Sequence, residues 1–309
     1  MRILITGGAG YVGSTLTIAL LERGFFVRCY DVLSFGGDHL IPFFRNPNYE
    51  FVNGDIRDGE NLKRCLQDID IIIHLAAVVG YPACKKDPQL ALQVNLTGAK
   101  ILNLSRSRQQ PILFASTGSS YGALVDNLCT EETPLNPLTV YGRTKGEAER
   151  ALLDAGNAIA YRFATAFGLS PRLRLDLLVN DFCYQALRNR SLVLYEAYFK
   201  RTFIHVADMA RAFIHAIDNY DTMKDNIYNC GDNSLNASKM EIADMIKRKI
   251  DFYFHAADIG KDEDARNYEV SYDKLSATGY RTEISLEQGI DEMIRAFHVI
   301  QIRNPYSNV

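Results

Sequence analysis

The N-terminal residues 2–13 read RILITGGAGYVG, a short apolar run followed at once by a glycine-rich loop. Gly7, Gly10 and Gly13 are spaced as GxxGxxG. Such glycines allow a tight turn, let the backbone approach a pyrophosphate and let the next helix pack closely on the strand. The free N–H groups at the helix start, near Tyr11 and Val12, then face the anion. Since a strand precedes the loop and an apolar helix follows it, these residues predict a dinucleotide-binding unit.

An acidic residue, Asp31, closes the second predicted strand, 18 residues after Gly13. A carboxylate at this place accepts hydrogen bonds from the adenosine ribose and repels a 2′-phosphate. We therefore expect NAD rather than NADP as the cofactor. Without the glycine loop, Asp31 would indicate only an ordinary turn.

Strands and helices alternate along the first half of the chain. Apolar runs typical of buried parallel strands lie at 2–6, 26–30, 50–53, 70–75, 111–116 and 158–163. Helical patterns lie between them, for example at 12–23 and 88–107. This alternation predicts an α/β fold with a doubly wound parallel Rossmann sheet.

The second half is less regular and predicts a smaller C-terminal substrate-binding lobe. We expect an NAD-binding domain over 1–168, to which about 202–230 returns, and the lobe mainly over 169–309. Helices are expected over 173–190 and 207–219, and a strand at 226–231. Capping boxes at 238–241 and 285–288 predict two further helix starts.

Composition excludes several classes of protein. The 309 residues are 47% hydrophobic and 23% charged, as in globular domains. The net charge of −3, without any run of Lys or Arg longer than two, argues against nucleic acid as a partner. No stretch is long and apolar enough for a membrane span, and no signal peptide is recognised, so we expect a cytoplasmic protein. The six cysteines lack metal-site spacing and are expected to be small buried side chains, with no metal bound.

Six motifs follow one another in a characteristic order: TGGAGYVG (6–13), Asp31, GDIRD (54–58), HLAA (74–77), STGSSYG (116–122) and YGRTK (141–145). Together they resemble the extended short-chain dehydrogenases, the NAD-dependent epimerase/dehydratase family that acts on nucleotide sugars. The resemblance covers nearly the whole chain. It implies that further residues line the cofactor site, namely Asp55, Ile56, Leu75, Ala76 and Ala77.

The resemblance also implies a homodimer, paired through the helix at 88–107 and the helix that opens at Tyr141. The first of these helices has more apolar faces than one sheet contact requires. The residues concerned are Ala91, Leu92, Leu96, Ala99 and Leu102.

The spacing YxxxK, which carries the catalytic pair in this family, occurs three times: Tyr81/Lys85, Tyr141/Lys145 and Tyr220/Lys224. Pro82 is expected to spoil a helix at the first pair. The third pair follows a helix in an acidic turn. Only Tyr141/Lys145 opens a helix after the strand that delivers Thr117, so we predict that Tyr141 and Lys145 are catalytic.

The proposed chemistry explains these residue types. Oxidising a secondary alcohol requires removal of its hydroxyl proton, and a free tyrosine, with a pKa near 10, is a poor base at pH 7. Lys145 lies one helical turn after Tyr141, where its ammonium favours tyrosinate and can hold the nicotinamide ribose. Thr117 occupies the family's Ser/Thr position and is expected to hydrogen-bond the reacting oxygen.

Two departures from family patterns narrow the reaction. Dehydratases of the family carry acidic residues immediately after this threonine, whereas this chain has Gly118 and Ser119. The 3,5-epimerising branch requires a cysteine in the same loop, and STGSSYG has none. We therefore expect neither dehydration nor 3,5-epimerisation.

The resemblance further implies a substrate site in the second half. Guanidinium groups suit diphosphate oxygens because they present a planar fork of donors. The expected substrate residues are Thr117, Ser119, Asn180, Arg174, Arg201 and Arg266, and Arg172 is a further candidate for the base or sugar. His205 is expected to cap a helix, and His74 to lie beside the cofactor or in the core.

These features imply an NAD-dependent oxidoreductase acting at C4 of a nucleotide-diphosphate sugar. Residues 129–135, 168–182 and 199–224 are most similar to the branch that oxidises GDP-heptose for capsule polysaccharide, which implies a C4 dehydrogenase forming a 4-keto sugar. A 4-epimerase needs the same residues and stays open as an alternative. A non-catalytic NAD-sensing regulator is a third possibility, although such proteins typically lack the Tyr–Lys pair.

Overall fold

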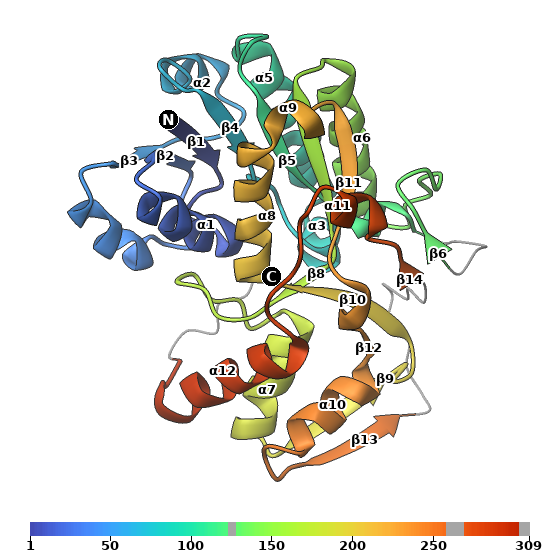
Figure 1. The fold of residues 1–309 in the computed structure, drawn as a ribbon. Coiled ribbons are helices and arrows are strands. Elements are labelled where there is room, and N and C mark those ends of the chain that lie inside the picture. The colour runs from blue at the N-terminus through green and yellow to red at the C-terminus, as the bar shows by residue number, and fades with distance from the viewer. Residues whose placement is uncertain (123–127, 258–268, 303–309) are drawn as a thin grey trace.

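The computed structural model describes residues 1–122, 128–257 and 269–302. Its larger part is a seven-stranded sheet in which all neighbouring strands are parallel. The predicted α/β fold with a Rossmann sheet is therefore confirmed (Figure 1). The strand order is β3 (Tyr49–Asn53), β2 (Phe26–Asp31), β1 (Arg2–Thr6), β4 (Ile71–His74), β5 (Ile112–Thr117), β7 (Ala158–Phe163) and β11 (Asn226–Cys230).

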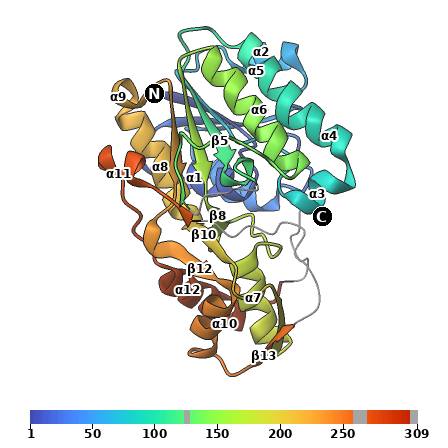
Figure 2. The same cartoon turned by 90° about the vertical axis from the view of Figure 1, so that its right-hand side faces the viewer.

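Helices cover both faces of this sheet, as Figure 2 shows. On one face, α1 (Tyr11–Glu22) and α8 (Val206–Asp218) bury Leu16 and Phe213 against the strands. On the other face lie α2 (Gly59–Cys65), α5 (Gly98–Ser105) and α6 (Val140–Asp154), with Leu62, Leu102 and Leu152 in a second core. A strand buried on both faces needs apolar side chains in both directions, which explains the continuous apolar runs in the sequence.

The helix predicted over 88–107 consists of three parts. A π-helical turn over Gln93–Thr97 separates α4 (Pro88–Leu92) from α5. Of the five apolar residues named for this helix, Ala91, Leu96, Ala99 and Leu102 are buried within the chain itself and Leu92 is exposed, and Leu104 near its end is exposed as well. Most of the apolar residues on which the dimer prediction rested are therefore used within the chain, and the dimer stays a prediction.

The smaller lobe lies below the sheet in Figure 1. It contains α7 (Leu178–Arg188), α10 (Lys239–Lys247) and α12 (Leu286–Val299), whose apolar faces share one core. Two small sheets complete it: β12 (Asn236–Ser238), β10 (Lys200–His205) and β8 (Thr165–Phe167) form one, and β13 (Tyr253–Ala257) and β9 (Ser191–Tyr195) the other.

The capping boxes of the lobe are confirmed, because Ser238 with Glu241 and Ser285 with Gln288 exchange both hydrogen bonds. The prediction of a helix from residue 173 is wrong, since α7 begins only at Leu178. In α12 the apolar face is buried as far as Phe297, whereas Ile300 follows the helix end and is exposed.

Shorter elements connect these parts. They are η1 (Asp38–Arg45), α3 (Tyr81–Lys86), η3 (Gly118–Ser120), β6 (Leu128–Cys129), α9 (Tyr220–Met223), η4 (Asn233–Leu235), β14 (Glu269–Val270) and α11 (Asp273–Ala277). All six cysteines are free and buried, as expected. Among the described residues, no helix is both long enough and apolar enough to cross a membrane.

Candidate active site

The glycine loop lies at the point where the strand order reverses, between β1 and β4. Gly7 has φ +75°, and its N–H donates to the Tyr30 carbonyl at 2.8 Å. A Cβ at Gly7 would lie 2.6 Å from the Ala76 nitrogen, and a Cβ at Gly13 would lie 2.4 Å from the Gly7 oxygen. Only glycine fits either position, and the bare backbone leaves a cradle of the kind that receives a dinucleotide pyrophosphate.

Asp31 lies at the rim of this cradle, at the carboxyl end of β2. Its Oδ2 accepts from the Ala9 N–H at 3.1 Å, and its Oδ1 accepts from the Leu33 N–H at 2.8 Å. Burial raises the pKa of Asp31, and the two backbone donors oppose this effect. The carboxylate is thus fixed next to the loop, where an adenosine ribose is expected.

The other predicted cofactor residues follow the ends of neighbouring strands. Leu75, Ala76 and Ala77 come directly after β4 and are half-buried. Ile56 is buried, and a Cβ at Gly98 of α5 would lie 2.7 Å from its side chain. The Asp55 carboxylate is partly exposed beside the Arg57 guanidinium at 2.5 Å, and its pKa is lowered by that neighbour. Their contacts with a cofactor stay predictions.

The predicted catalytic pair lies at the start of α6. Thr139 caps this helix by accepting from the Gly142 N–H at 3.1 Å. Tyr141 is in the first turn and Lys145 follows one turn later. A Cβ at Gly142 would lie 2.6 Å from the Ser119 carbonyl oxygen, so glycine lets the loop after β5 approach this turn closely.

That loop carries Thr117. Its Oγ1 accepts from the Ser119 N–H at 3.2 Å, which caps η3. The Ser120 hydroxyl donates to the Gly142 carbonyl at 3.0 Å and ties η3 to α6. The structure therefore brings the end of β5 and the start of α6 together. Gly142 was not predicted from the sequence, because its role depends on a contact distant along the chain.

Lys145 is only 2% exposed, and its Nζ lies 4.0 Å from the centre of the Phe114 ring. Burial lowers the pKa of Lys145 to about 7, although the Glu149 carboxylate one turn further along α6 opposes this. An ammonium deprived of water strongly stabilises an anion beside it. This environment suits a lysine that favours tyrosinate at Tyr141.

The burial of Lys145 predicts a specific pH dependence of stability. The folded pKa of about 7 lies below that of the unfolded chain, so the unfolded state binds more protons between these values. Lys145→Met is therefore expected to be more stable than the wild type at pH 6, with the difference fading as the pH rises toward 10. Urea unfolding of both proteins, freed of cofactor, at several pH values measures this. A difference independent of pH would contradict it.

His74 ends β4 and is fully buried. Its Nδ1 lies 2.7 Å from the Thr6 hydroxyl, and its ring stacks on Phe114 at 5.4 Å. Burial lowers the pKa of His74 to about 3, and the charge of Lys145 adds to this effect. His74 is thus a neutral, packed histidine at the carboxyl edge of the sheet.

The other two YxxxK pairs lie elsewhere. The expectation that Pro82 spoils a helix is wrong, because Tyr81–Lys86 forms α3 with Pro82 in its first turn, where proline is tolerated. The third pair is remote from the site. The Tyr220 hydroxyl donates to the Asn157 side chain at 2.7 Å, and Tyr220 lines a small pocket with Met1, at the amino edge of the sheet.

Asn95 is a site residue that the sequence did not reveal. It lies in the π-helical turn and is buried, and its amide bonds both the N–H and the carbonyl of Val78 at 2.7 and 3.0 Å. Its Nδ2 also donates to the Thr144 hydroxyl at 3.2 Å. Asn95 thereby joins the segment after β4 to the catalytic helix. Short π-helical insertions are frequent at functional sites, but the apolar pattern around Asn95 gave no such signal.

The predicted substrate residues are spread over the second lobe. Asn180 is fully buried, and its Oδ1 accepts from the Gly168 N–H at 2.9 Å while its Nδ2 donates to the Arg174 carbonyl at 2.9 Å. The Arg174 guanidinium pairs with Asp176 at 2.6 Å. Arg201 is half-buried in β10, and Arg266 lies outside the described residues. Their substrate contacts stay predictions.

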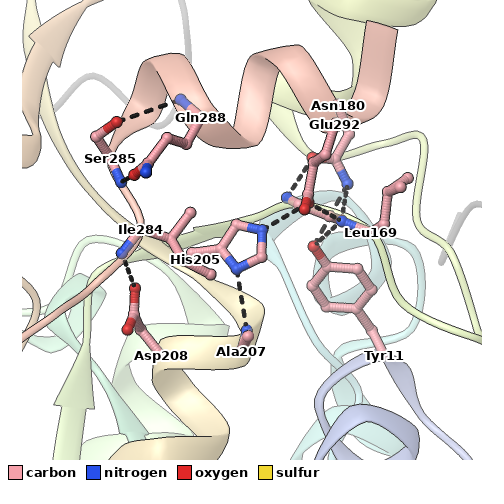
Figure 3. Close-up of polar contacts among 11 residues, drawn as sticks. Tyr11, Leu169, Asn180, His205, Ala207, Asp208, Ile284, Ser285, Gln288 and Glu292 are labelled. Atoms are coloured by element: carbon pink, nitrogen blue, oxygen red, sulfur yellow. Dashed lines mark hydrogen bonds and ion pairs between the residues drawn. The ribbon is translucent and has the colours of Figure 1, made fainter. Parts of the chain in front are cut away.

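Figure 3 shows how these segments meet. His205 caps α8, as expected, by accepting from the Ala207 N–H at 3.2 Å. Its Nε2 lies 2.7 Å from the Glu292 carboxylate of α12, which also accepts from the Leu169 N–H at 2.9 Å. The Tyr11 hydroxyl, at the glycine loop, donates to the Gly168 carbonyl at 2.6 Å. One polar cluster therefore connects three segments: the start of α1 at the cofactor loop, the residues after β8, and α12 of the second lobe.

Comparison with known proteins gives the family. Residues 3–231 match the NAD dependent epimerase/dehydratase family. The chain belongs to this family. As a member it is an NAD-dependent enzyme of the nucleotide-sugar epimerase/dehydratase type, with NAD as its cofactor.

Its relatives within the epimerase/dehydratase family carry out several reactions. It is 30% identical over 305 residues, 94% of this chain and 97% of the relative, to a protein of Methanocaldococcus jannaschii named "Putative UDP-glucose 4-epimerase". UDP-glucuronic acid decarboxylase 1 of Arabidopsis thaliana is 27% identical, over 96% of this chain and 70% of the relative. The UDP-glucose 4-epimerase of Thermus thermophilus, solved with NAD, has a TM-score of 0.82 and 26% identity, over 97% and 99% of the two chains.

For this family member, Asp31 predicts the choice of cofactor. Protein denatured after purification is expected to release NAD and not NADP. Asp31→Asn keeps the size of the side chain but removes the charge that repels a 2′-phosphate, so the preference for NAD should fall by about tenfold or more. Titration of cofactor-free protein with both dinucleotides measures this. Release of NADP from the wild type would contradict the role given to Asp31.

Proposed function

We propose that this enzyme oxidises C4 of a nucleotide-diphosphate sugar to a 4-keto sugar and does not dehydrate it. The observation that carries this proposal is the junction of η3 and α6. There the Gly142 contact brings Thr117 and Ser119 next to the turn that holds Tyr141 and Lys145. A base and an alcohol-binding hydroxyl are present at this junction, and Gly118 and Ser119 stand at the positions where dehydratases of the family carry acids.

Three residues of the junction act on the proton of the C4 hydroxyl. Tyr141 removes the proton of the C4 hydroxyl, and Lys145 stabilises the resulting tyrosinate from a buried position. Thr117, fixed at the end of β5, donates to the reacting oxygen. Bound NAD supplies the acceptor of the C4 hydride.

The nucleotide end of the substrate is assigned to the second lobe. Asn180, Arg174, Arg201 and Arg266 supply amide and guanidinium donors for the diphosphate and its surroundings. Arg174 is held against Asp176 and Asn180 is held by backbone groups, so these two residues are already positioned. Ser119 lies beside Thr117 and is assigned to the sugar.

Two fates of the 4-keto sugar fit this site. The similarity of residues 129–135, 168–182 and 199–224 to the GDP-heptose branch supports release of the keto sugar, a C4 dehydrogenase reaction, and we take this as the leading function. The relative of M. jannaschii named as a 4-epimerase supports return of the hydride to the other face.

The test is to incubate the purified enzyme with GDP-, UDP- and dTDP-sugars in deuterated water and to follow C4 by NMR. Accumulation of a 4-keto sugar together with NADH indicates a dehydrogenase, preferentially with a GDP-sugar. A C4 epimer without deuterium incorporation indicates an epimerase. Loss of water, or loss of carbon dioxide from a glycuronate, would overturn the proposal.

A further inference from the structure

Residues 168–172, which we call the crossover strap, leave β8 and pass over the cofactor loop. Tyr11 donates to the Gly168 carbonyl at 2.6 Å, and the Ser170 hydroxyl donates to the Tyr11 carbonyl at 2.7 Å. Further along, the Arg172 N–H donates to the Ser14 hydroxyl at 3.4 Å. The strap therefore lies against the first turn of α1, the helix that opens directly after the glycine loop.

The strap is also held from the side of the second lobe, as Figure 3 shows. The Gly168 N–H donates to Asn180, and the Leu169 N–H donates to Glu292. Gly168 has φ +106°, and a Cβ there would lie 2.1 Å from the His205 ring. Because its backbone is fixed on both sides, the strap presents the Arg172 side chain from a defined position.

That side chain points back toward the cofactor domain. Arg172 is only 2% exposed, and its guanidinium carbon lies 4.2 Å from the centre of the Phe35 ring, in the segment that follows Asp31. His39 of the same region lies with its Nε2 2.8 Å from the Ala9 carbonyl of the glycine loop. Burial lowers the pKa of His39, and the nearby charge of Arg172 lowers it further. The guanidinium thus lies beside Phe35 and near His39, which contacts the glycine loop.

We propose that Arg172 is a cofactor-binding residue, whose guanidinium donates to the pyrophosphate of NAD. The glycine loop offers neutral N–H donors to two negatively charged phosphates. A guanidinium supplied by the second lobe adds the missing positive charge in a planar fork of donors. The sequence suggested the base or sugar of the substrate as a ligand of Arg172, and the geometry points to the cofactor instead.

This inference concerns cofactor binding alone, so its failure is distinguishable from failure of the proposed C4 reaction. The experiment compares Arg172→Gln with Arg248→Gln, a control on the second lobe whose wild-type guanidinium pairs with Glu287 and is assigned to no site. Calorimetry on cofactor-free protein measures the affinity for NAD, for ADP-ribose, which has the pyrophosphate, and for adenosine, which has none.

For Arg172→Gln we expect NAD and ADP-ribose to bind about ten- to a hundredfold more weakly, the range for a charge-assisted hydrogen bond, with adenosine unchanged. Arg248→Gln should bind all three within about threefold of the wild type, as expected without a lost contact to the ligand. An unchanged affinity of Arg172→Gln for ADP-ribose, or an equal loss for ADP-ribose and adenosine, would overturn the assignment.

Should Arg172→Gln not fold, as judged by thermal melting, Arg172→Lys keeps the positive charge without the fork. It is then expected to bind ADP-ribose with an affinity below that of the wild type, and adenosine as the wild type does. Wild-type affinity of Arg172→Lys for ADP-ribose would overturn the role of the guanidinium fork.

Discussion

Tyr141→Phe is expected to retain its fold and its NAD but to lose turnover by a factor on the order of 10³ or more, because the proton acceptor and the stabilisation of the alkoxide disappear together. Only a hydroxyl is removed from a half-buried ring, so packing changes little. Lys145→Met should fail similarly. Steady-state kinetics with the substrate identified by NMR, together with the NAD content of each variant, provide the measurement.

The other two motif matches supply the controls. Tyr81→Phe and Tyr220→Phe are each expected to stay within about tenfold of the wild type, since neither residue is given a proton to move. Tyr81 is the stricter control, because it begins a true helix after β4 with Lys85 one turn later. An inactive Tyr81→Phe beside an active Tyr141→Phe would show that the wrong tyrosine has been assigned.

Glu149→Gln is expected to lower the free energy of unfolding by about 3–5 kcal/mol, the cost of leaving a buried charge without its partner. Glu149 and Arg162 are 2% and 5% exposed. The Arg162 guanidinium donates to the Glu149 carboxylate at 2.6 Å, to the Tyr121 hydroxyl at 3.0 Å and to the Glu131 carbonyl at 3.1 Å. Burial disfavours the charge of Arg162, but Glu149 more than compensates, so the pKa of Arg162 is raised.

Urea unfolding of Glu149→Gln is compared with that of Glu147→Gln, an exposed position on the same helix, where a change within about 0.5 kcal/mol is expected. The double variant Glu149→Leu/Arg162→Leu should lose less stability than Glu149→Gln, because no unpaired charge remains. Equal stabilities of the Glu149 and Glu147 variants would contradict the role given to this buried pair.

The regular half of the fold could be predicted because its signals are local. Strands β1 and β7 have the predicted bounds, since both are mainly apolar and buried along nearly their whole length. The second lobe was harder to predict, because each of its strands forms only where a partner distant in the chain supplies hydrogen bonds. Residues 173–177 look helical by composition, but the crossover strap precedes them and the helix begins later, at Leu178.

In the candidate site, too, residues with a local sequence signal could be predicted and residues that depend on distant contacts could not. The glycine loop, Asp31 and the Tyr141/Lys145 pair were predicted, because each needs its residue type at a fixed spacing. Gly142 and Asn95 were not predicted. Gly142 lets the Ser119 carbonyl approach the helix closely, and Asn95 hydrogen-bonds Val78, and both of these partners are distant in sequence. Contacts between segments far apart in the chain leave no local pattern.

Strand β11 occupies the edge of the parallel sheet although residues 226–230 come after much of the second lobe in the chain. Helix α8, whose Ala212 carbonyl accepts from the Tyr161 hydroxyl of β7 at 2.9 Å, reaches the sheet equally late. During synthesis the first 168 residues are therefore made before β11 and α8. Until those elements follow, β7 is an unpaired edge strand and one face of the sheet is only partly covered. Such sequence-distant closure slows folding and exposes aggregation-prone surface. A gene fragment ending at residue 168 is accordingly a poor source of an isolated cofactor domain.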